Sequence, residues 1–355
     1  MDINERLRKT PSSPGIYIMK DVKDKTIYVG KAKHLRNRLR SYFRSSASLD
    51  TRISEMVKSI KDFDYIVTKN ELEALVLEAN YIKRLKPKYN IILRDDKNYP
   101  FLKLDMSENW PRLEVVRRTG NDHSLYFGPY IPSGTMWEVL RFIRKNFLLR
   151  TCRYNLAKPM RPCVQYQMKR CLAPCSETRR TGQYKEEYDE TVKEVKLFLQ
   201  GEKRELLSHL RNQMKRLSDT LRFEDAASIR DRLRLIEKAW EPQRVVTPEL
   251  GDMDVIALHR AKGCASVFIF FIRNGMVIGQ NDFFLNKIGE IQTEELIESF
   301  LEQFYSKEIP IPPRIIIPFK TRFKTIREWL SRKRGKIVRL SQARSDNEKK
   351  IYRMA

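Results

Sequence analysis

The stretch that most constrains the fold is residues 15–42, because it combines a tight hairpin pattern with a basic helical pattern. Two runs rich in Ile, Tyr and Val, Gly15–Met19 and Thr26–Gly30, flank a polar turn at Asp21–Lys25. This arrangement predicts a two-stranded hairpin. Because side chains alternate along a strand, a register that pairs Tyr17 with Tyr28 would place both phenols on one face.

The residues after the hairpin predict a helix that begins near Lys31. One stripe of that helix is polar and follows i, i+3, i+7, i+11 spacing: Lys31, His34, Arg38 and Tyr42. The neighbouring stripe is apolar and should face the core: Leu35, Leu39 and Phe43. Two phenols, two cations and an imidazole are therefore expected to converge beside a sheet.

Such a set suits attack on a phosphodiester. Cations stabilise charge that develops on the phosphate, and a positioned phenol or imidazole accepts a proton from water. A phenol needs neighbouring cations to act as a base near neutrality, because its usual pKa is about 10. The same residues also fit a basic, solvated helix beside a hairpin with interfacial tyrosines, and the pattern alone leaves both interpretations open.

The composition favours an anionic partner. The chain has 355 residues, enough for two or three domains, with 70 Lys and Arg against 45 Asp and Glu. Its net charge of +25 points first to nucleic acid and second to a membrane surface. No apolar run is long enough to span a bilayer, and residues 1–15 are too polar for a signal peptide, so a cytoplasmic location is expected.

A buried carboxylate is expected on a helix that follows a third strand at Phe63–Thr68. Asn70 and Glu73 have the spacing of a capping box, and the helix should end near Leu85, before a proline. Glu78 lies on or beside the apolar face of this helix and needs a partner. It could pair with an arginine, or it could hold Mg²⁺, which commonly takes one or two protein carboxylates.

Four cysteines cluster in the most basic part of the chain, where residues 141–180 carry three Lys and eight Arg against one Glu. This part is the strongest candidate for contact with backbone phosphates. The thiols are spaced C-x10-C-x7-C-x3-C at Cys152, Cys163, Cys171 and Cys175. Four thiolates suit Zn²⁺ or an iron–sulfur cluster, the absence of paired C-x2-C spacing counts somewhat against zinc, and simple buried thiols are the third alternative.

Two further regions follow. Residues 184–240 repeat apolar side chains at intervals of three and four, which predicts an antiparallel helical hairpin whose exposed seam binds a partner or docks on its own chain.

Residues 241–355 show three strands, a helix, a strand, a helix and a strand, the order of a ribonuclease-H-like mixed sheet. A nuclease of that kind needs several converging carboxylates. Asp254 could be the first, but the strand at 314–317 supplies none, so we expect a catalytically inert copy.

These motifs resemble a known family. Gly15-Ile16-Tyr17 and Tyr28-Val29-Gly30 resemble the GIY-YIG nucleases, RPCVQYQMKRCLAPC at 161–175 is similar to the UvrC cysteine motif, and FEDAA at 223–227 resembles the UVR motif. The implied fold class is multidomain α+β. Its parts are a GIY-YIG domain (1–95), a linker and cysteine-rich helical region (96–183), a UVR helical hairpin (184–240) and an inert ribonuclease-H-like α/β domain (241–355).

The resemblance also implies a function, namely a DNA endonuclease that cuts damaged double-stranded DNA on the three-prime side of a lesion after recruitment by UvrB. It implies Mg²⁺ or Mn²⁺ on Glu78, and a 4Fe-4S cluster, or else Zn²⁺, on the four cysteines. The nuclease site would comprise Tyr17, Tyr28, Lys31, His34, Arg38, Tyr42, Glu78 and Asn90. Tyr17 would activate water, and UvrB would contact the hairpin at Phe223, Glu224 and Ala227.

Two rival functions remain open at this point. One is a stand-alone, structure-specific GIY-YIG nuclease that needs no partner, and the other is a non-catalytic adaptor that bridges UvrB and DNA. Chains of the UvrC family continue into a second nuclease and tandem helix–hairpin–helix motifs. Neither is found in these 355 residues, so we interpret the chain as C-terminally truncated.

Overall fold

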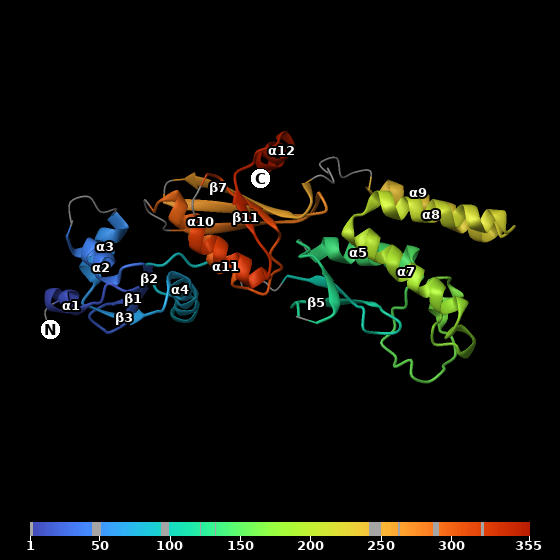
Figure 1. The fold of residues 1–355 in the computed structure, drawn as a ribbon, viewed down its shortest axis with the longest axis horizontal. Coiled ribbons are helices and arrows are strands. Elements are labelled where there is room, and N and C mark those ends of the chain that lie inside the picture. The colour runs from blue at the N-terminus through green and yellow to red at the C-terminus, as the bar shows by residue number, and fades with distance from the viewer. Residues whose placement is uncertain are drawn as a thin grey trace.

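The computed structural model describes residues 3–44, 51–93, 99–120, 122–131, 133–240, 250–261, 263–286, 291–320 and 323–355. The described parts form an elongated arrangement in which a small sheet domain lies at one end, a larger sheet at the centre and a helical hairpin at the other end (Figure 1). The expected domain boundaries near residues 95 and 241 lie outside the described residues.

The N-terminal domain is a three-stranded antiparallel sheet of order β2-β1-β3 with helices around it. Its elements are α1 (Ile3–Lys9), β1 (Gly15–Lys20), β2 (Thr26–Ala32), α2 (Leu35–Arg44), α3 (Thr51–Ser59), β3 (Asp62–Val67) and α4 (Glu71–Leu85). The predicted hairpin, third strand and capped helix are confirmed. The side chain of Asn70 accepts a hydrogen bond from the backbone amide of Glu73, and the Glu73 carboxylate accepts one from the backbone amide of Lys69.

The predicted start of the next helix is wrong, because Lys31 belongs to β2 and α2 begins at Leu35. Pairing with β1 continues past the glycine, with Lys31 opposite Ile16 and Ala32 opposite Gly15. The first free amides of α2 then donate to carbonyls of residues 11 and 13, which fixes the helix start. Leu35 and Leu39 are fully buried, as predicted for the apolar stripe.

The middle region and the helical hairpin share one core. A second sheet of order β5-β4-β6 packs with the helices, and its core includes Leu102, Ile143, Tyr188, Leu206 and Ile236. The elements are β4 (Phe101–Asp105), β5 (Leu113–Val116), β6 (Ser124–Phe127), α5 (Ser133–Asn146), α6 (Val164–Gln167), η1 (Glu177–Arg179), α7 (Gln183–Gln200), α8 (Lys203–Asp219) and α9 (Phe223–Trp240). The segment predicted as a linker is thus a packed unit.

The predicted hairpin is confirmed, but it comprises α8 and α9 alone, because residues 184–200 of the predicted range belong to α7. Its two ends differ in burial. At its base Leu210 and Ile236 are fully buried, and Arg232 pairs with the buried Glu194 of α7 at 3.1 Å. At the tip Leu221 and Phe223 are 75% and 61% exposed. The hairpin therefore docks on its own chain at one end and leaves an apolar tip free for a partner.

The C-terminal domain has the predicted mixed sheet, of order β11-β10-β7-β8-β9. Strands β7, β8 and β9 are antiparallel, and β10 runs parallel to β7 and β11. The elements are β7 (Met253–Ala261), β8 (Cys264–Arg273), β9 (Met276–Asn286), α10 (Thr293–Tyr305), β10 (Arg314–Ile316), α11 (Lys324–Arg334), β11 (Arg339–Ser341) and α12 (Asp346–Met354).

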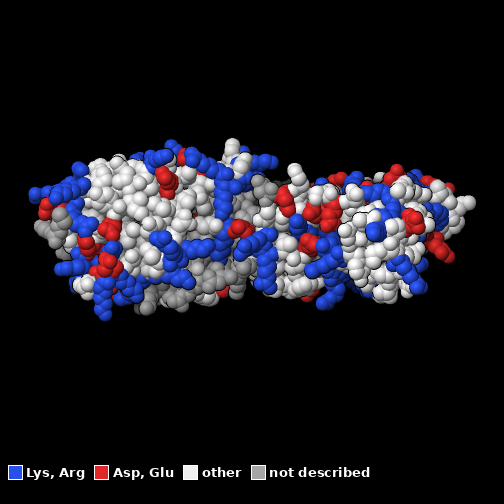
Figure 2. Space-filling model, turned by 90° about the horizontal axis from the view of Figure 1, so that it is seen from below, with Lys and Arg blue, Asp and Glu red and all other residues white. Residues whose placement is uncertain are grey.

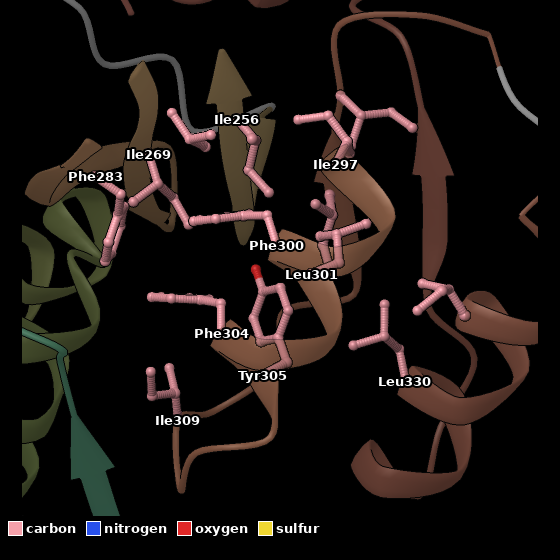
Figure 3. Packing of buried hydrophobic residues seen from close by; sticks show 14 of the residues in the cluster. Ile256, Ile269, Phe283, Ile297, Phe300, Leu301, Phe304, Tyr305, Ile309 and Leu330 are labelled. Carbon is pink, nitrogen blue, oxygen red and sulfur yellow. The ribbon is translucent and has the colours of Figure 1, made fainter. Parts of the chain in front are cut away.

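Helix α10 joins the two nuclease-like domains. The rings of Phe300 and Phe304 on this helix are stacked, with 5.4 Å between their centroids. They pack against Ile269 and Phe283 of the central sheet (Figure 3). The same core includes Leu75 of α4, so the helix that carries Glu78 packs on the C-terminal domain as well as on its own sheet. This contact places the acidic face of α10 beside the N-terminal site.

Candidate active site

A layer of three tyrosines lies on the hairpin. The register pairs Tyr17 with Gly30 and Met19 with Tyr28, so the two tyrosines are not directly opposite each other but lie two residues apart on the same face. The two rings still meet, at 6.0 Å between centroids. Gly30 makes this possible, because a Cβ there would overlap the Tyr17 hydroxyl.

Helix α2 closes this layer with Tyr42 and Arg38. The hydroxyls of Tyr17 and Tyr42 share a hydrogen bond of 2.9 Å, and Arg38 Nε donates to Tyr17 Oη at 3.4 Å. The Arg38 guanidinium also lies over the Tyr42 ring, 5.1 Å from its centroid. His34, by contrast, is exposed, and its Nδ1 lies 2.9 Å from the carbonyl oxygen of Ser12. Its ring is thus engaged by the segment that precedes β1.

Burial controls the ionisation of the phenols. Desolvation raises the pKa of Tyr17 well above its usual value, the hydroxyl of Tyr42 raises it further, and Arg38 only partly opposes this rise. The pKa of Tyr28 is raised in the same way, mainly by burial. The expectation that neighbouring cations would make Tyr17 a base near neutrality is therefore wrong for this structure, in which both phenols are neutral at pH 7.

Glu78 is buried and pairs with Lys31. The Lys31 amide donates to Glu78 Oε1 at 2.9 Å, and its ammonium Nζ lies 3.0 Å from Oε2. The cation partner is thus a lysine of β2, rather than an arginine. Burial raises the pKa of Glu78, and Lys31 opposes that rise. The double contact fixes α4 against the edge strand of the sheet.

Two carboxylates of α10 reach the same lysine and were missed by the sequence analysis. Lys31 Nζ lies 3.5 Å from Glu302 Oε2 and 3.7 Å from Glu298 Oε1. Glu302 is 3% exposed, and its pKa is raised well above the usual value by burial and by Glu78 and Glu298, despite Lys31. Three carboxylates thus face one ammonium. No sequence signal marked Glu302, which is separated from Lys31 by 271 positions.

A small cavity of about 60 Å³ is lined by half of the predicted nuclease residues. Its N-terminal wall contains Tyr28, Lys31, Glu78 and Asn90, and its other wall comes largely from α10. Asn90 is held firmly, because its Oδ1 accepts from the Val29 amide at 2.8 Å and its Nδ2 donates to the Val29 carbonyl at 2.7 Å. Tyr17, Arg38 and Tyr42 form the layer behind Tyr28.

The four cysteines lie near one another in the middle region. Cys171 is buried and Cys163 is exposed. The backbone amide of Ala173 donates a hydrogen bond to the Sγ of Cys171 at 3.3 Å. Burial, with a smaller contribution from the other three thiols, raises the pKa of Cys171 to about 11. Among the described residues, however, no three His, Cys, Asp or Glu side chains are grouped closely enough to hold a metal ion.

The other predicted sites are also placed. At the hairpin tip Phe223 and Glu224 are exposed and Ala227 is half-buried. Asp254 of β7 is fully buried, with Arg273 Nη1 at 2.7 Å and the Tyr305 hydroxyl at 2.6 Å. These two partners already occupy its oxygens, so Asp254 is a structural carboxylate in this arrangement.

Four family models match successive parts of the chain. They describe a UvrC-like GIY-YIG domain (residues 13–91), a UvrC/Cho excinuclease middle domain (99–198), a UvrB/uvrC motif (204–239) and a UvrC ribonuclease H-like domain (252–355). Together with the fold, these matches define a multidomain protein that carries a GIY-YIG endonuclease domain.

Curated UvrC proteins are similar to the whole of this chain. UvrABC system protein C of Symbiobacterium thermophilum is 42% identical over 355 residues, which are all of this chain and 56% of that protein. The same-named protein of Clostridioides difficile is 39% identical over 360 residues, covering 99% of this chain and 59% of that protein. The chain belongs to the UvrC family. It spans a little over half the length of these relatives.

Solved structures match the N-terminal domain. The GIY-YIG N-terminal endonuclease domain of UvrC from Thermotoga maritima, bound to its catalytic divalent cation magnesium, is 42% identical and covers 26% of this chain and all of that one, with a TM-score of 0.22. A point mutant of that domain, also bound to its catalytic divalent cation, is 38% identical with a TM-score of 0.23. As for membranes, none of the helices in the described ranges has the length and apolar character to span one.

Substituting Gly30 tests the tyrosine layer. We expect Gly30→Ala to push the Tyr17 ring aside and to lower stability by about 1–3 kcal/mol, as overpacking does. Faster hydrogen exchange of the β1 and β2 amides would report this loss. Gly134→Ala is the matched control, because a Cβ at Gly134 meets nothing within 4 Å. Equal protection in the two variants would contradict the proposed need for glycine at position 30.

Proposed function

We propose that this chain is the DNA endonuclease subunit of nucleotide excision repair, hydrolysing a phosphodiester on the three-prime side of a lesion after recruitment by UvrB. The observation that carries the proposal is the cavity shared by Tyr28, Lys31, Glu78 and Asn90. The order of the four family matches supports it. The absence of a helix in the described ranges that could span a membrane, and the basic composition, fit a cytoplasmic DNA-binding protein.

Glu78 would hold Mg²⁺ or Mn²⁺. Three carboxylates face one ammonium in a small cavity, and Mg²⁺ needs only one or two of them. When bound, the ion would polarise the phosphate or the leaving oxygen. Lys31 would stabilise negative charge on the phosphate. Glu298 and Glu302 also pair with this lysine in the present arrangement, so a phosphate would compete with both carboxylates for it.

The phenols divide the work of handling protons. Tyr28 lines the cavity, so it is the phenol that contacts a water there, while the fully buried Tyr17 lies one layer behind. The family motif implies that Tyr17 activates water. In this structure Tyr17 would instead act through its contacts with Tyr42 and Arg38: it would hold the layer of three tyrosines in place and pass a proton between the two hydroxyls. His34 is an accessory residue, and Asn90 positions Val29 on the edge strand.

UvrB would bind the hairpin through Phe223, Glu224 and Ala227. The apolar tip is exposed while the base is buried, which is the distribution expected of a docking element. The ribonuclease-H-like domain would be non-catalytic, because Asp254 is paired with Arg273 and accepts a hydrogen bond from Tyr305. That domain would serve as a scaffold that positions the nuclease domain.

Incision of a lesion-bearing, end-labelled duplex preloaded with UvrB tests the function. With Mg²⁺ or Mn²⁺ we expect a nick on the three-prime side, and we expect Glu78→Gln to reduce its rate at least about 10²-fold while DNA and UvrB binding persist. Glu295→Gln is the control, because Glu295 lines the same cavity without an ion pair to Lys31.

Each rival function predicts a different result. Nicking at the same rate without UvrB would indicate the stand-alone nuclease. A stable complex that this chain never nicks would indicate either the adaptor or a need for the C-terminal half that its longer relatives carry. Full nicking by Glu78→Gln would contradict the role assigned to that carboxylate.

The four cysteines would hold a 4Fe-4S cluster, with Zn²⁺ as the alternative, in a structural role. Four neighbouring thiols supply the right donors, although their positions in this structure are not those of a ligand set. We expect protein purified without oxygen to contain iron and sulfide, and Cys171→Ser to lose both along with thermal stability. Cys264→Ser, an exposed thiol on β8, should keep them. Stoichiometric zinc would indicate the alternative, and no metal would contradict both.

A further inference from the structure

An open cleft of about 590 Å³ lies between α5 and the cysteine-bearing segment. Its lining includes four cations, one aromatic ring and one amide: Arg141, Arg144, Lys145, Arg170, Trp137 and Gln165. Figure 1 places α5 well away from α4, so this cleft is separate from the nuclease cavity. The face of the molecule in Figure 2 shows Lys and Arg along its whole length, so the composition of the cleft, and not basicity alone, distinguishes this site.

One face of α5 is built for this cleft. Trp137, Arg141, Arg144 and Lys145 follow i, i+4, i+7, i+8 spacing, so they share a face of the helix, and all four are exposed. The buried face of the same helix carries Met136, Leu140 and Ile143, which anchor it in the core. The opposite wall of the cleft carries Gln165 on α6 and Arg170 just after it.

The four cations are uncompensated. No acidic side chain lines the cleft, and within the described ranges no ion pair engages any of these four cations. Other well-placed cations of the chain have carboxylate partners, such as Arg150 with Glu108 and Arg232 with Glu194. Four unpaired cations around one cleft create a strongly positive local field, which a run of phosphates would satisfy.

The exposed tryptophan narrows the kind of ligand. Trp137 is 49% exposed on the face that carries the cations, although a ring of this size is normally well buried. A positive groove with an aromatic platform is the combination that binds single-stranded nucleic acid, in which an unpaired base stacks on the ring. An acidic peptide would satisfy the cations and would leave the ring without a partner.

We propose that this cleft binds the backbone of single-stranded DNA, with Arg141, Arg144, Lys145 and Arg170 on the phosphates and Trp137 stacked on an unpaired base. The proposal rests on the proposed function, because it assumes that DNA is the ligand of the chain. It adds a second DNA site, away from the cavity of Glu78, that recognises an unpaired stretch.

Fluorescence anisotropy with a labelled oligothymidine and a duplex of equal length tests this site in the full chain without any incision step. We expect Arg141→Ala/Arg144→Ala to weaken binding to the oligothymidine about 10- to 100-fold at low salt. The slope of log K against log salt should fall by about 1.4, because two phosphate contacts are lost. Lys349→Ala/Lys350→Ala, which removes the same charge from exposed positions on α12, should change neither quantity as much.

Trp137 gives the second, independent readout. Trp137→Ala should weaken binding of the single strand about 5- to 100-fold without changing the salt slope, and it should affect the duplex much less. Trp137→Phe should retain most of the affinity, because a phenyl ring also stacks. All of these side chains are exposed, so circular dichroism should show intact folding.

Several results would overturn the cleft proposal. They are unchanged binding in the α5 variants, equal losses for single strand and duplex with Trp137→Ala, or competition by polyglutamate as effective as that by DNA. These results are separable from failure of the proposed function. A chain that never nicks a lesion-bearing duplex but shows the expected anisotropy losses would refute only the nuclease, and a nicking chain with unaffected α5 variants would refute only the cleft.

Discussion

The ion pair between Lys31 and Glu78 is the interaction on which the rest of the arrangement depends. A buried carboxylate is costly unless it is paired and hydrogen-bonded, and Glu78 receives both the amide and the ammonium of Lys31. The pair ties α4 to the edge strand β2. The same helix buries Leu75 in the core of α10 and the central sheet. One helix therefore connects the candidate nuclease site to the largest domain of the chain.

The geometry of the site follows from this connection. In the hairpin the Tyr17 ring packs over Gly30, and Tyr42 and Arg38 of α2 contact the Tyr17 hydroxyl from the other side. Helix α10 supplies the other wall, and with it the carboxylates of Glu295, Glu298 and Glu302. Their charge makes the cavity suited to a cation, and Glu298 and Glu302 also pair with Lys31. The same contacts that prepare the cavity for a metal ion therefore withhold its lysine from a phosphate.

The sequence predicted the local features well and the tertiary ones less well. The hairpin, the Asn70 cap and the order of strands and helices along the last domain depend on short-range patterns, and all are present. The start of α2 was wrong because Lys31 pairs across the hairpin with Ile16, and a helix-like spacing of polar residues cannot reveal that pairing. The predicted direction of the pKa shift of Tyr17 was wrong, because burial raises this pKa by more than Arg38 lowers it. Glu302 was missed because nothing local distinguishes it from the acidic face of any amphipathic helix.

The central claim is that Glu78, and not the α10 carboxylates, is the residue that holds a divalent cation in this cavity. Electron paramagnetic resonance of Mn²⁺ titrated into the intact chain measures this binding directly, without DNA. The account predicts that Glu78→Gln abolishes the bound signal and that Glu302→Gln retains it, because Glu302 acts only through Lys31. Undiminished Mn²⁺ binding by Glu78→Gln, or its loss in Glu302→Gln alone, would contradict the account.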